Sequence, residues 1–335
     1  MRSVSVTASL LALPLEHALT IARGTSTESR TVLVRVACEG AEGIGECAPI
    51  PRYHETVESV LDLYAAKMAK PIEVRDFDGV LDLVPQAARC GLDIALHDLL
   101  GKRLGAPLWE IFGLDPARVP LTSFTIYIDE VATMVEEAKR YRSAPILKVK
   151  LGLGSELETI ESIRSVYSGT IRIDANEGWS AEESVALLGQ MERYDIEFCE
   201  QPIPAGKPEQ LGWIRERVRI PIVADEDSVT ASDLPSLIGR VDGVNVKLSK
   251  CGGIRAAHAM IHTARALGFK IMLGCMTESS ILITAAGHLA PLVDWADLDG
   301  NLMLAREPFV GMTHNSGRLT LPDSPGLGIV ETVAV

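Results

Sequence analysis

Several features that mark common classes of protein are missing from this chain of 335 residues. No run of apolar residues reaches the roughly 18 that a membrane-spanning helix needs. No basic stripe is present, and 45 acidic residues outnumber 32 basic ones, for a formal net charge of −13. Because nucleic-acid binding needs clustered Lys and Arg, we expect neither a membrane protein nor a nucleic-acid partner.

The cysteines, glycines and histidines also lack the spacings of common functional sites. The six cysteines contain no C-x-x-C pair, which argues against a disulfide framework or a structural zinc site and fits reduced thiols in a cytoplasmic enzyme. No G-x-G-x-x-G follows a predicted strand, so a dinucleotide-binding fold is disfavoured. His258 and His262 lie one helical turn apart without the Glu of an H-E-x-x-H zinc site, and we interpret them as packing or surface residues.

The amino terminus allows two interpretations. Met1 and Arg2, followed by an apolar stretch to Leu15, resemble a short secretory signal. However, Val4–Thr7 alternates with period two, as a strand does, and no small-residue cleavage site follows. We therefore predict that this stretch belongs to the folded part of a cytoplasmic protein.

The sequence pattern of residues 1–115 predicts a small α+β domain. Arg30–Ala37 and Ile44–Ala48 have the pattern of two strands in a hairpin, and Ala87–Leu104 has apolar residues at helical spacing. We expect the C-terminal segment, residues 316–335, to complete this domain. Hydrophobic residues make up 47% of the chain, so a sizeable core is also expected.

The pattern of apolar residues repeats at regular intervals over residues 116–315. Apolar strands recur in steps of roughly 23–27 residues, the length of one strand, one helix and two loops. The predicted strands are Leu121–Ile126, Ile146–Leu151, Thr170–Ile173, Ile196–Cys199, Ile220–Val223, Gly243–Leu248, Phe269–Leu273 and Val293–Ala296. A capping box at Ser180–Glu183 begins one of the intervening helices. Eight such strands in succession predict a closed parallel (β/α)-barrel.

Charged residues stand at the carboxyl ends of most of these strands, where a barrel places its active site. Three successive ends supply Asp174, Glu200 and Asp225. Three converging carboxylates repel one another unless a hard cation lies between them, and oxygen ligands favour Mg²⁺ or Mn²⁺. The alternatives are that Asp174 and Asp225 cap helices and that Glu200 is a solvated loop residue.

Lysines flank these carboxylates. Lys148 and Lys150 are two apart on one strand, so both point to one face, which we expect to be the barrel interior. Lys247 ends a strand about half a barrel away. These lysines either neutralise the carboxylates or act as bases. A proton α to a carboxylate leaves as an enediolate, which a divalent cation stabilises, and we expect a neighbouring ammonium and the metal to lower the pKa of the basic lysine. Bases on opposite faces would permit epimerisation.

Together these motifs resemble those of the enolase superfamily, muconate-lactonising-enzyme subgroup, over nearly the whole chain. The matching stretches are Gly45–Pro49, Leu92–Asp98, Lys148–Lys150, Asp174–Asn176, Glu200–Pro202, Ala224–Glu226 and Asn245–Gly253. The resemblance implies a modified (β/α)7β barrel under a capping domain. It also implies one Mg²⁺ held by Asp174, Glu200 and Asp225, acid/base roles for Lys150 and Lys247, and a carboxylate-binding role for Lys148.

Two further motifs resemble those of dipeptide epimerases. Asp297-Leu298-Asp299-Gly300 resembles their signature, which implies that the two aspartates bind the α-ammonium group of the substrate. Ile21–Gly24 and Pro51–Tyr53 resemble the specificity loops of L-Ala-D/L-Glu epimerases, which implies that Arg23 meets the glutamate side chain. Thr125, Tyr53 and Lys250 are further candidate substrate-binding residues. Cys275 stands at a strand end and could be the nucleophile of a hydrolase, but no His partner can be placed nearby, so we expect it to line the substrate pocket. Asp297 and Asp299 could instead cap a turn, and Arg23 could be a solvated loop residue.

One position departs from the family pattern, because Asp227 stands where Ser is usual and adds a negative charge beside the predicted metal site. The leading hypothesis is an epimerase of acidic dipeptides, suited to recycling cell-wall (murein) peptides. The alternatives are a different dipeptide, an o-succinylbenzoate synthase or N-succinylamino acid racemase, a cycloisomerase, and a binding protein on an inactive barrel. The expected partner is a small-molecule substrate, and a homo-oligomer stays open.

Overall fold

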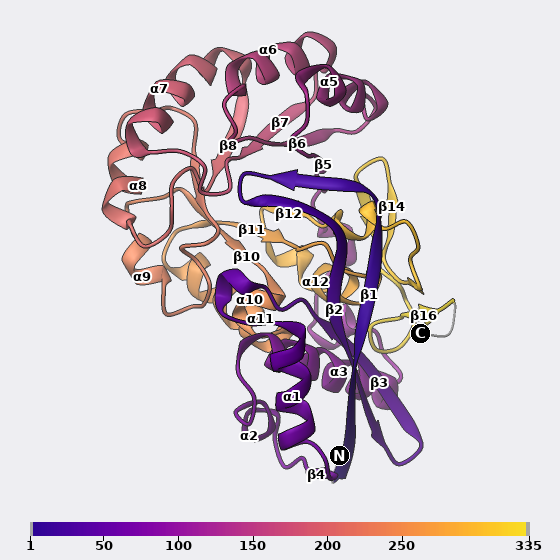
Figure 1. The fold of residues 1–335 in the computed structure, drawn as a ribbon. Coiled ribbons are helices and arrows are strands. Elements are labelled where there is room, and N and C mark those ends of the chain that lie inside the picture. Colours follow the sequence, from indigo (N-terminus) through magenta and orange to yellow (C-terminus); the bar gives the residue numbers. More distant parts are fainter. Residues whose placement is uncertain (1–2, 333–335) are drawn as a thin grey trace.

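A computed structural model describes residues 3–332 of the chain. Met1 and Arg2, which begin both the alternative secretory signal and the predicted capping domain, lie outside this range, as do residues 333–335 of the predicted C-terminal segment. Figure 1 shows a barrel on one side of the molecule and a smaller layered domain on the other.

The predicted barrel is confirmed. Eight parallel strands follow one another in chain order around a single sheet. A parallel bridge between Thr122 and Ala296 brings its first and last strands together, and Ser123 N–H donates to Ala296 O at 3.3 Å. The strands are β5 (Phe124–Ile126), β6 (Ile146–Lys150), β7 (Thr170–Asp174), β8 (Ile196–Glu200), β9 (Ile222–Ala224), β10 (Gly243–Val246), β11 (Lys270–Gly274) and β12 (Trp295–Asp297).

Helices follow seven of these strands and cover the outside of the sheet, because each has an apolar stripe that the apolar outer face of the strands can bury. They are α5 (Val131–Arg140), α6 (Glu156–Val166), α7 (Ala181–Met191), α8 (Pro208–Arg215), α9 (Leu234–Leu237), the pair α10 (Leu248–Cys251) and α11 (Ile254–Ala266), and α12 (Ser280–Gly287). The capping box of Ser180 and Glu183 begins α7, as predicted. A 3₁₀ turn, Gly300–Met303, follows β12, so the barrel has the expected (β/α)7β form.

The N-terminal region forms a four-stranded antiparallel sheet in the order β3-β2-β1-β4. Its strands are β1 (Ser3–Ile21), β2 (Gly24–Cys38), β3 (Ala41–Cys47) and β4 (Ile72–Glu73), and its helices are α1 (Val57–Lys67), α2 (Phe77–Leu81), α3 (Gln86–Leu104) and α4 (Leu108–Ile111). The predicted hairpin and long helix are confirmed, although β1 is far longer than the predicted Val4–Thr7. Glycine at Gly45 lets β3 lie against α3, since a Cβ there would stand 2.2 Å from Gly91 O.

The C-terminal segment returns to this region after the short strands β13 (Phe309–Val310), β14 (Thr313–Asn315) and β15 (Arg318–Thr320). Leu327 N–H donates to Asp98 of α3 at 2.8 Å, and Glu331 of β16 (Val330–Glu331) pairs with Arg35 of β2 at 2.6 Å. These contacts support assigning the segment to the capping domain, while the boundaries at 115/116 and 315/316 stay predictions.

The β1–β2 hairpin reaches from the capping domain across the carboxyl ends of the barrel strands (Figure 1). Ile128 N–H, after β5, donates to Thr20 O at 2.9 Å, and Ser29 Oγ donates to Thr277 O, after β11, at 2.5 Å. The hairpin thus contacts the loops after β5 and β11, the strands on either side of β12 in the closed barrel, and partly covers the barrel mouth. Within residues 3–332, no helix has both the length and the apolar character for crossing a bilayer.

Candidate active site

One side of the barrel mouth is organised around Lys148 of β6. Its ammonium lies 2.6 Å from Glu200 Oε2, 2.7 Å from Asp297 Oδ2 and 3.1 Å from Asp174 Oδ2. Lys150, two residues on, points to the same interior face, as the period of a strand requires, and lies 2.7 Å from the same Asp174 oxygen. Lys148 is almost fully buried, and the Lys150 side chain is 11% exposed.

The opposite side is organised around Asp225, at the end of β9. Lys247, at the end of β10, donates to Asp225 Oδ2 at 2.8 Å. Lys250 pairs with the other carboxylate oxygen of Asp225 and donates to the backbone carbonyls of Asp225, Asn245 and Ser228 at 2.6, 3.0 and 3.3 Å. The Lys250 side chain is fully buried, and these four oxygens surround its ammonium group, so the geometry favours a role in orienting Asp225 over the expected contact with substrate.

Nearby lysines lower the pKa of two of the three carboxylates. Burial alone would raise the pKa of Asp174, but Lys150 and Lys148 outweigh it and hold the pKa below its usual range. Lys247 and Lys250 do the same for Asp225 against its burial. Asp174 and Asp225 are therefore anionic at neutral pH, with a lysine beside each.

The pKa values of Glu200 and Lys247 are both raised. Burial raises the pKa of Glu200, and the nearby Asp174 charge adds to the effect. Burial lowers the pKa of Lys247, but Asp225 and Glu200 outweigh it and the net direction is upward. The buried carboxylates thus contribute more to the pKa of Lys247 than the nearby Lys148, which lowers it. The expected lowering of the pKa of the basic lysine by an ammonium and the metal together stays a prediction.

The donor set fits a hard divalent cation. Asp174, Glu200 and Asp225 end adjacent strands and supply only oxygen donors, and Asn245 Nδ2 orients Glu200 by donating to its Oε1 at 2.7 Å. Glu200 Oε2 is buried and lacks a hydrogen bond of good geometry despite its ion pair with Lys148. In the part of the chain that the structure describes, no three Asp, Glu, His or Cys side chains form a ready-made ligand group. Lys148 instead lies between two of the carboxylates, so ligation by these three residues stays a prediction.

A second wall of the site carries Asp297 and Asp299. Asp297 Oδ1 accepts from Ser123 Oγ at 2.6 Å while its Oδ2 faces Lys148. Asp299 accepts from the backbone N–H of Thr125 at 2.7 Å, and its side chain does not cap the following turn. Burial and the charge of Asp297 raise the pKa of Asp299 to about 6. Two carboxylates so close can bind an ammonium group.

Cys275, at the end of the neighbouring β11, stands close to this wall. Burial and the charge of Asp299 raise the pKa of its thiol well above the ordinary value. A thiol in that state is a poor nucleophile. The position therefore fits the predicted lining role rather than covalent catalysis.

The rim of the site is made by the capping domain and barrel loops together. Arg23 lies in the turn between β1 and β2, as expected, and its Nη1 meets Glu226 Oε1 at 2.5 Å, Glu177 Oε2 at 3.2 Å and Asn176 O at 3.3 Å. Arg52 donates to both oxygens of Glu177, at 3.0 and 2.8 Å. Asn176 and Glu177 have φ of 44° and 69°, a left-handed backbone that is uncommon outside glycine and that carries Glu177 toward both arginines.

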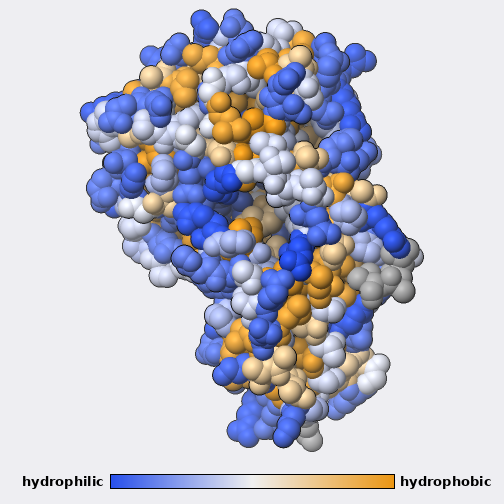
Figure 2. Space-filling model, in the orientation of Figure 1, coloured by the Kyte–Doolittle hydropathy of each residue, from blue (hydrophilic) through white to orange (hydrophobic). Residues whose placement is uncertain are grey.

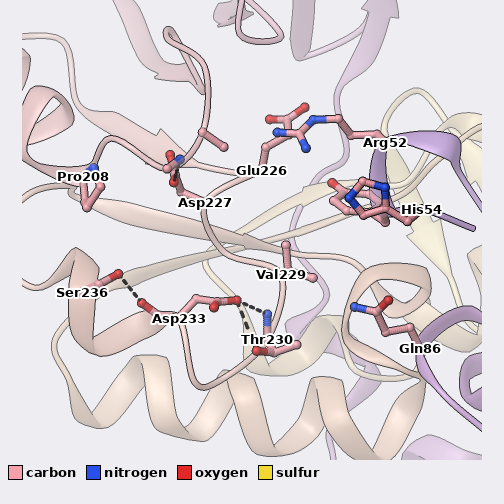
Figure 3. A pocket seen from close by; sticks show the side chains of 13 residues that line it. Arg52, His54, Gln86, Pro208, Glu226, Asp227, Val229, Thr230, Asp233 and Ser236 are labelled. Atoms are coloured by element: carbon pink, nitrogen blue, oxygen red, sulfur yellow. Dashed lines mark hydrogen bonds between the residues drawn. The ribbon is translucent and has the colours of Figure 1, made fainter.

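A cavity of about 660 Å³ opens beside this rim, between the loop that carries Arg52, Tyr53 and His54 and the loops after β8 and β9. Figure 2 shows this region as a hollow bordered by hydrophilic residues. Figure 3 shows Arg52 and Glu226 pointing toward one another at its edge. The predicted substrate-binding residue Tyr53 lines this cavity, and burial and the nearby charge of Asp225 raise its pKa, so it is a neutral phenol.

Several residues of the site were not predicted from the sequence. Glu177 directly follows the motif Asp174–Asn176, and Glu226 is the last residue of the motif Ala224–Glu226. Neither was assigned a role, and their charge was the available signal. Glu278, after β11, is buried, and neither of its carboxylate oxygens has a hydrogen-bond partner among residues 3–332; burial raises its pKa well above the ordinary value. Asp227, the departure from the family pattern, accepts from Gln201 Nε2 at 2.8 Å and Gly206 N–H at 2.7 Å. Its carboxylate therefore stabilises a loop.

His258 and His262 lie on α11 outside the barrel, as interpreted from the sequence. Their Nε2 atoms are 3.3 Å apart, and the His258 ring stacks on Phe112 with ring centroids 5.7 Å apart. These contacts are packing contacts.

A closed barrel with lysines and carboxylates at its strand ends, partly covered by an α+β domain, defines a class of capped (β/α)-barrel enzymes. Residues 3–113 match the family model described as mandelate racemase / muconate lactonizing enzyme, N-terminal domain, and residues 131–331 match the model described as enolase C-terminal domain-like. The chain belongs to the enolase superfamily, as the sequence motifs indicated.

Within this superfamily, the chain is similar to several proteins named as dipeptide epimerases. The chain is 39% identical to L-Ala-D/L-Glu epimerase of Bacteroides thetaiotaomicron over 328 residues, which cover 95% of this chain and 86% of that one. It is 35% identical to L-Ala-D/L-amino acid epimerase of Maribacter sp., covering 95% and 96%. The structure of a dipeptide epimerase from Cytophaga hutchinsonii with Mg and D-Ala-L-Val superposes with a TM-score of 0.94 at 30% identity, covering 99% and 96%.

Proposed function

We propose that this chain is a Mg²⁺-dependent dipeptide epimerase that inverts the α-carbon of the second residue by 1,1-proton transfer. The observation that carries the proposal is the placement of Lys150 and Lys247. They end β6 and β10, four strands apart in a sheet of eight, so their amines face each other across the barrel mouth. The three carboxylates of β7, β8 and β9 lie on the arc between them.

Each lysine serves one face of the α-carbon. As a neutral amine, one lysine takes the α-proton, while the other, as an ammonium, delivers a proton to the opposite face. The product is the other epimer, and the protonation states of the lysines are exchanged. Lys148, with its charge held inside the barrel, binds and polarises the substrate carboxylate, and Lys250 keeps Asp225 oriented.

Asp174, Glu200 and Asp225 would hold the metal. When bound there, Mg²⁺ would offset the carboxylate charges that raise the pKa of Lys247 and stabilise the negative charge that develops on the substrate carboxylate. Mn²⁺ would use the same oxygen donors. The structure of the similar Cytophaga dipeptide epimerase contains Mg, which supports Mg²⁺ as the metal.

The remaining groups of the substrate are assigned by charge. Asp297 and Asp299 would bind its α-ammonium group, with Thr125 and Cys275 lining the same wall. Its side chain would point to the rim, toward Arg23 and Tyr53. The first candidate substrate is L-Ala-D/L-Glu, in a cytoplasmic enzyme that recycles murein peptides, because Arg23 can bind a carboxylate and because a relative carries that name.

A second candidate is a broader L-Ala-D/L-amino acid epimerase. The ion pairs that already engage Arg23 favour it, as does the name of the Maribacter relative. A lyase or cycloisomerase is disfavoured, because substrates without an ammonium group leave Asp297 and Asp299 without a role.

The test is to incubate the enzyme with a small library of L-Ala-L-Xaa dipeptides and Mg²⁺ in D₂O and to follow the α-proton of each residue by NMR. We expect deuterium only at the second residue, together with formation of the other epimer. Exchange at the first residue, or none with any dipeptide, would contradict the proposal.

A further inference from the structure

Two arginines and two glutamates at the rim form one ion-pair network. Glu177 contacts both Arg23 and Arg52, and Glu226 contacts Arg23. The glutamate side chains are only 10% and 1% exposed, so solvent screens these pairs incompletely. The network is formally neutral before a substrate side chain arrives.

Arg23 keeps one edge free for a ligand. Its hydrogen bonds to other described residues all come from Nη1. Across residues 3–332, Nε and Nη2 of Arg23 have no hydrogen-bond partner, and the side chain is 36% exposed. A substrate side chain can therefore approach the guanidinium from the open edge.

A carboxylate at that edge would share Arg23 with two other anions. Like charges about 6 Å apart at an effective dielectric near 20 repel by an amount equivalent to roughly 100-fold in affinity. Solvent at the half-exposed rim reduces this to roughly 10-fold for each glutamate. This repulsion offsets much of the gain from a charge-assisted contact with Arg23, whereas a neutral side chain meets neither the repulsion nor the gain.

We propose, resting on the proposed function, that Glu177 is a specificity-determining residue. By neutralising Arg23 and Arg52 it keeps the rim from selecting acidic side chains, so neutral second residues compete with glutamate. Glu177 is the most informative residue to change, because it contacts both arginines, whereas Glu226 adjoins Asp225.

The experiment compares L-Ala-L-Glu with the isosteric neutral dipeptide L-Ala-L-Gln. The measured quantity is the ratio of kcat/KM for the two substrates, in which any general loss of activity cancels. In Glu177→Gln we expect this ratio to rise about 10-fold above wild type. The matched control is Glu197→Gln, at the opposite end of the barrel. It removes the negative charge that lies 2.6 Å from Arg172 Nε, and it should leave the ratio unchanged.

The gain should depend on Arg23, so adding Arg23→Ala to Glu177→Gln should remove most of it. Glu226→Gln supplies a second test if Glu177→Gln folds poorly, and it should shift the ratio in the same direction. An unchanged ratio in the glutamate variants would overturn the inference, and a fall would show that Glu177 orients Arg23 for acidic substrates. Wild-type enzyme that epimerises no dipeptide would instead overturn the proposed function, and this inference with it.

Discussion

The floor of the active site and its rim contain similar side chains but are built differently. The floor consists of strand-end residues such as Lys148, Asp174 and Glu200, which are almost completely buried. The rim consists of Arg23 and Arg52 on capping-domain loops, with side chains 36% and 37% exposed. Strands held by neighbours on both sides can fix atoms within the tolerance that proton transfer requires, whereas loops can change without disturbing the barrel.

This difference indicates that the floor carries out the reaction and the rim sets substrate preference. Changes in the floor should affect the reaction on every substrate, because all substrates present the same α-carbon and carboxylate. Changes in the rim should affect some substrates more than others, because only the side chain reaches it. Perturbing the floor, the rim and a residue outside both would test whether the two regions have these separate roles.

Metal removal should have the largest effect. Without a cation, three carboxylates on adjacent strands have only lysines to offset their charge, and those lysines are needed for proton transfer. We expect exhaustive chelation to abolish turnover of every dipeptide and added Mg²⁺ to restore it. Full activity in thoroughly metal-free enzyme would refute the assignment of Asp174, Glu200 and Asp225.

Replacing either floor lysine should also stop epimerisation of all substrates. Lys150→Ala and Lys247→Ala should each lower the rate by about 10²- to 10⁴-fold, the contribution of a positioned acid or base. Each variant should still exchange the α-proton of one epimer with D₂O, and the two should choose opposite epimers. A Lys247→Ala enzyme that epimerises at an appreciable rate would rule out two bases.

The rim arginine should show a smaller and selective effect. Arg23→Ala should lower kcat/KM for L-Ala-L-Glu by about 10-fold, near the lower limit for one charge-assisted contact, because Glu226 and Glu177 already engage the guanidinium. Turnover of L-Ala-L-Leu should be nearly unchanged. Equal losses on both substrates would show that Arg23 supports the hairpin and does not contact the side chain.

A residue outside both regions should affect stability and leave catalysis unchanged. His288 is buried, and its Nδ1 accepts from Trp109 N–H while Nε2 lies 3.2 Å from Leu327 O, so the folded protein needs the neutral ring. Burial lowers the pKa of His288 from 6.5 to about 4. The unfolded chain therefore takes up the proton first, and stability is lost as pH falls from 6.5 to 4.

The change amounts to about 3 kcal/mol in the free energy of unfolding. Denaturant unfolding of His288→Gln between pH 7 and pH 4 should show a correspondingly weaker dependence on pH than wild type. Replacement of the exposed His17 provides the control and should keep the wild-type slope. The same slope in His288→Gln would mean that other groups account for the acid sensitivity.

The sequence alone was sufficient to predict the barrel and the lysines and carboxylates of its floor. The strands are short apolar runs at a steady spacing, and their ends carry charges that an apolar strand would not otherwise contain, so local pattern was informative. Lys148 and Lys150 could be placed on one face from the period of a strand alone. Their contacts with Asp174 confirm that orientation.

Tertiary structure alone decided how those charges pair. Strand spacing does not say that Lys148 lies between Glu200 and Asp174, or that oxygens of Asp225, Ser228 and Asn245 surround the Lys250 ammonium, because such pairings depend on which groups the closed sheet brings within a few ångströms. The upward shift of the Lys247 pKa follows from the same cause. The rim was least predictable, since Arg23 and Glu177 are 154 positions apart and meet only because the β1–β2 hairpin crosses the barrel mouth.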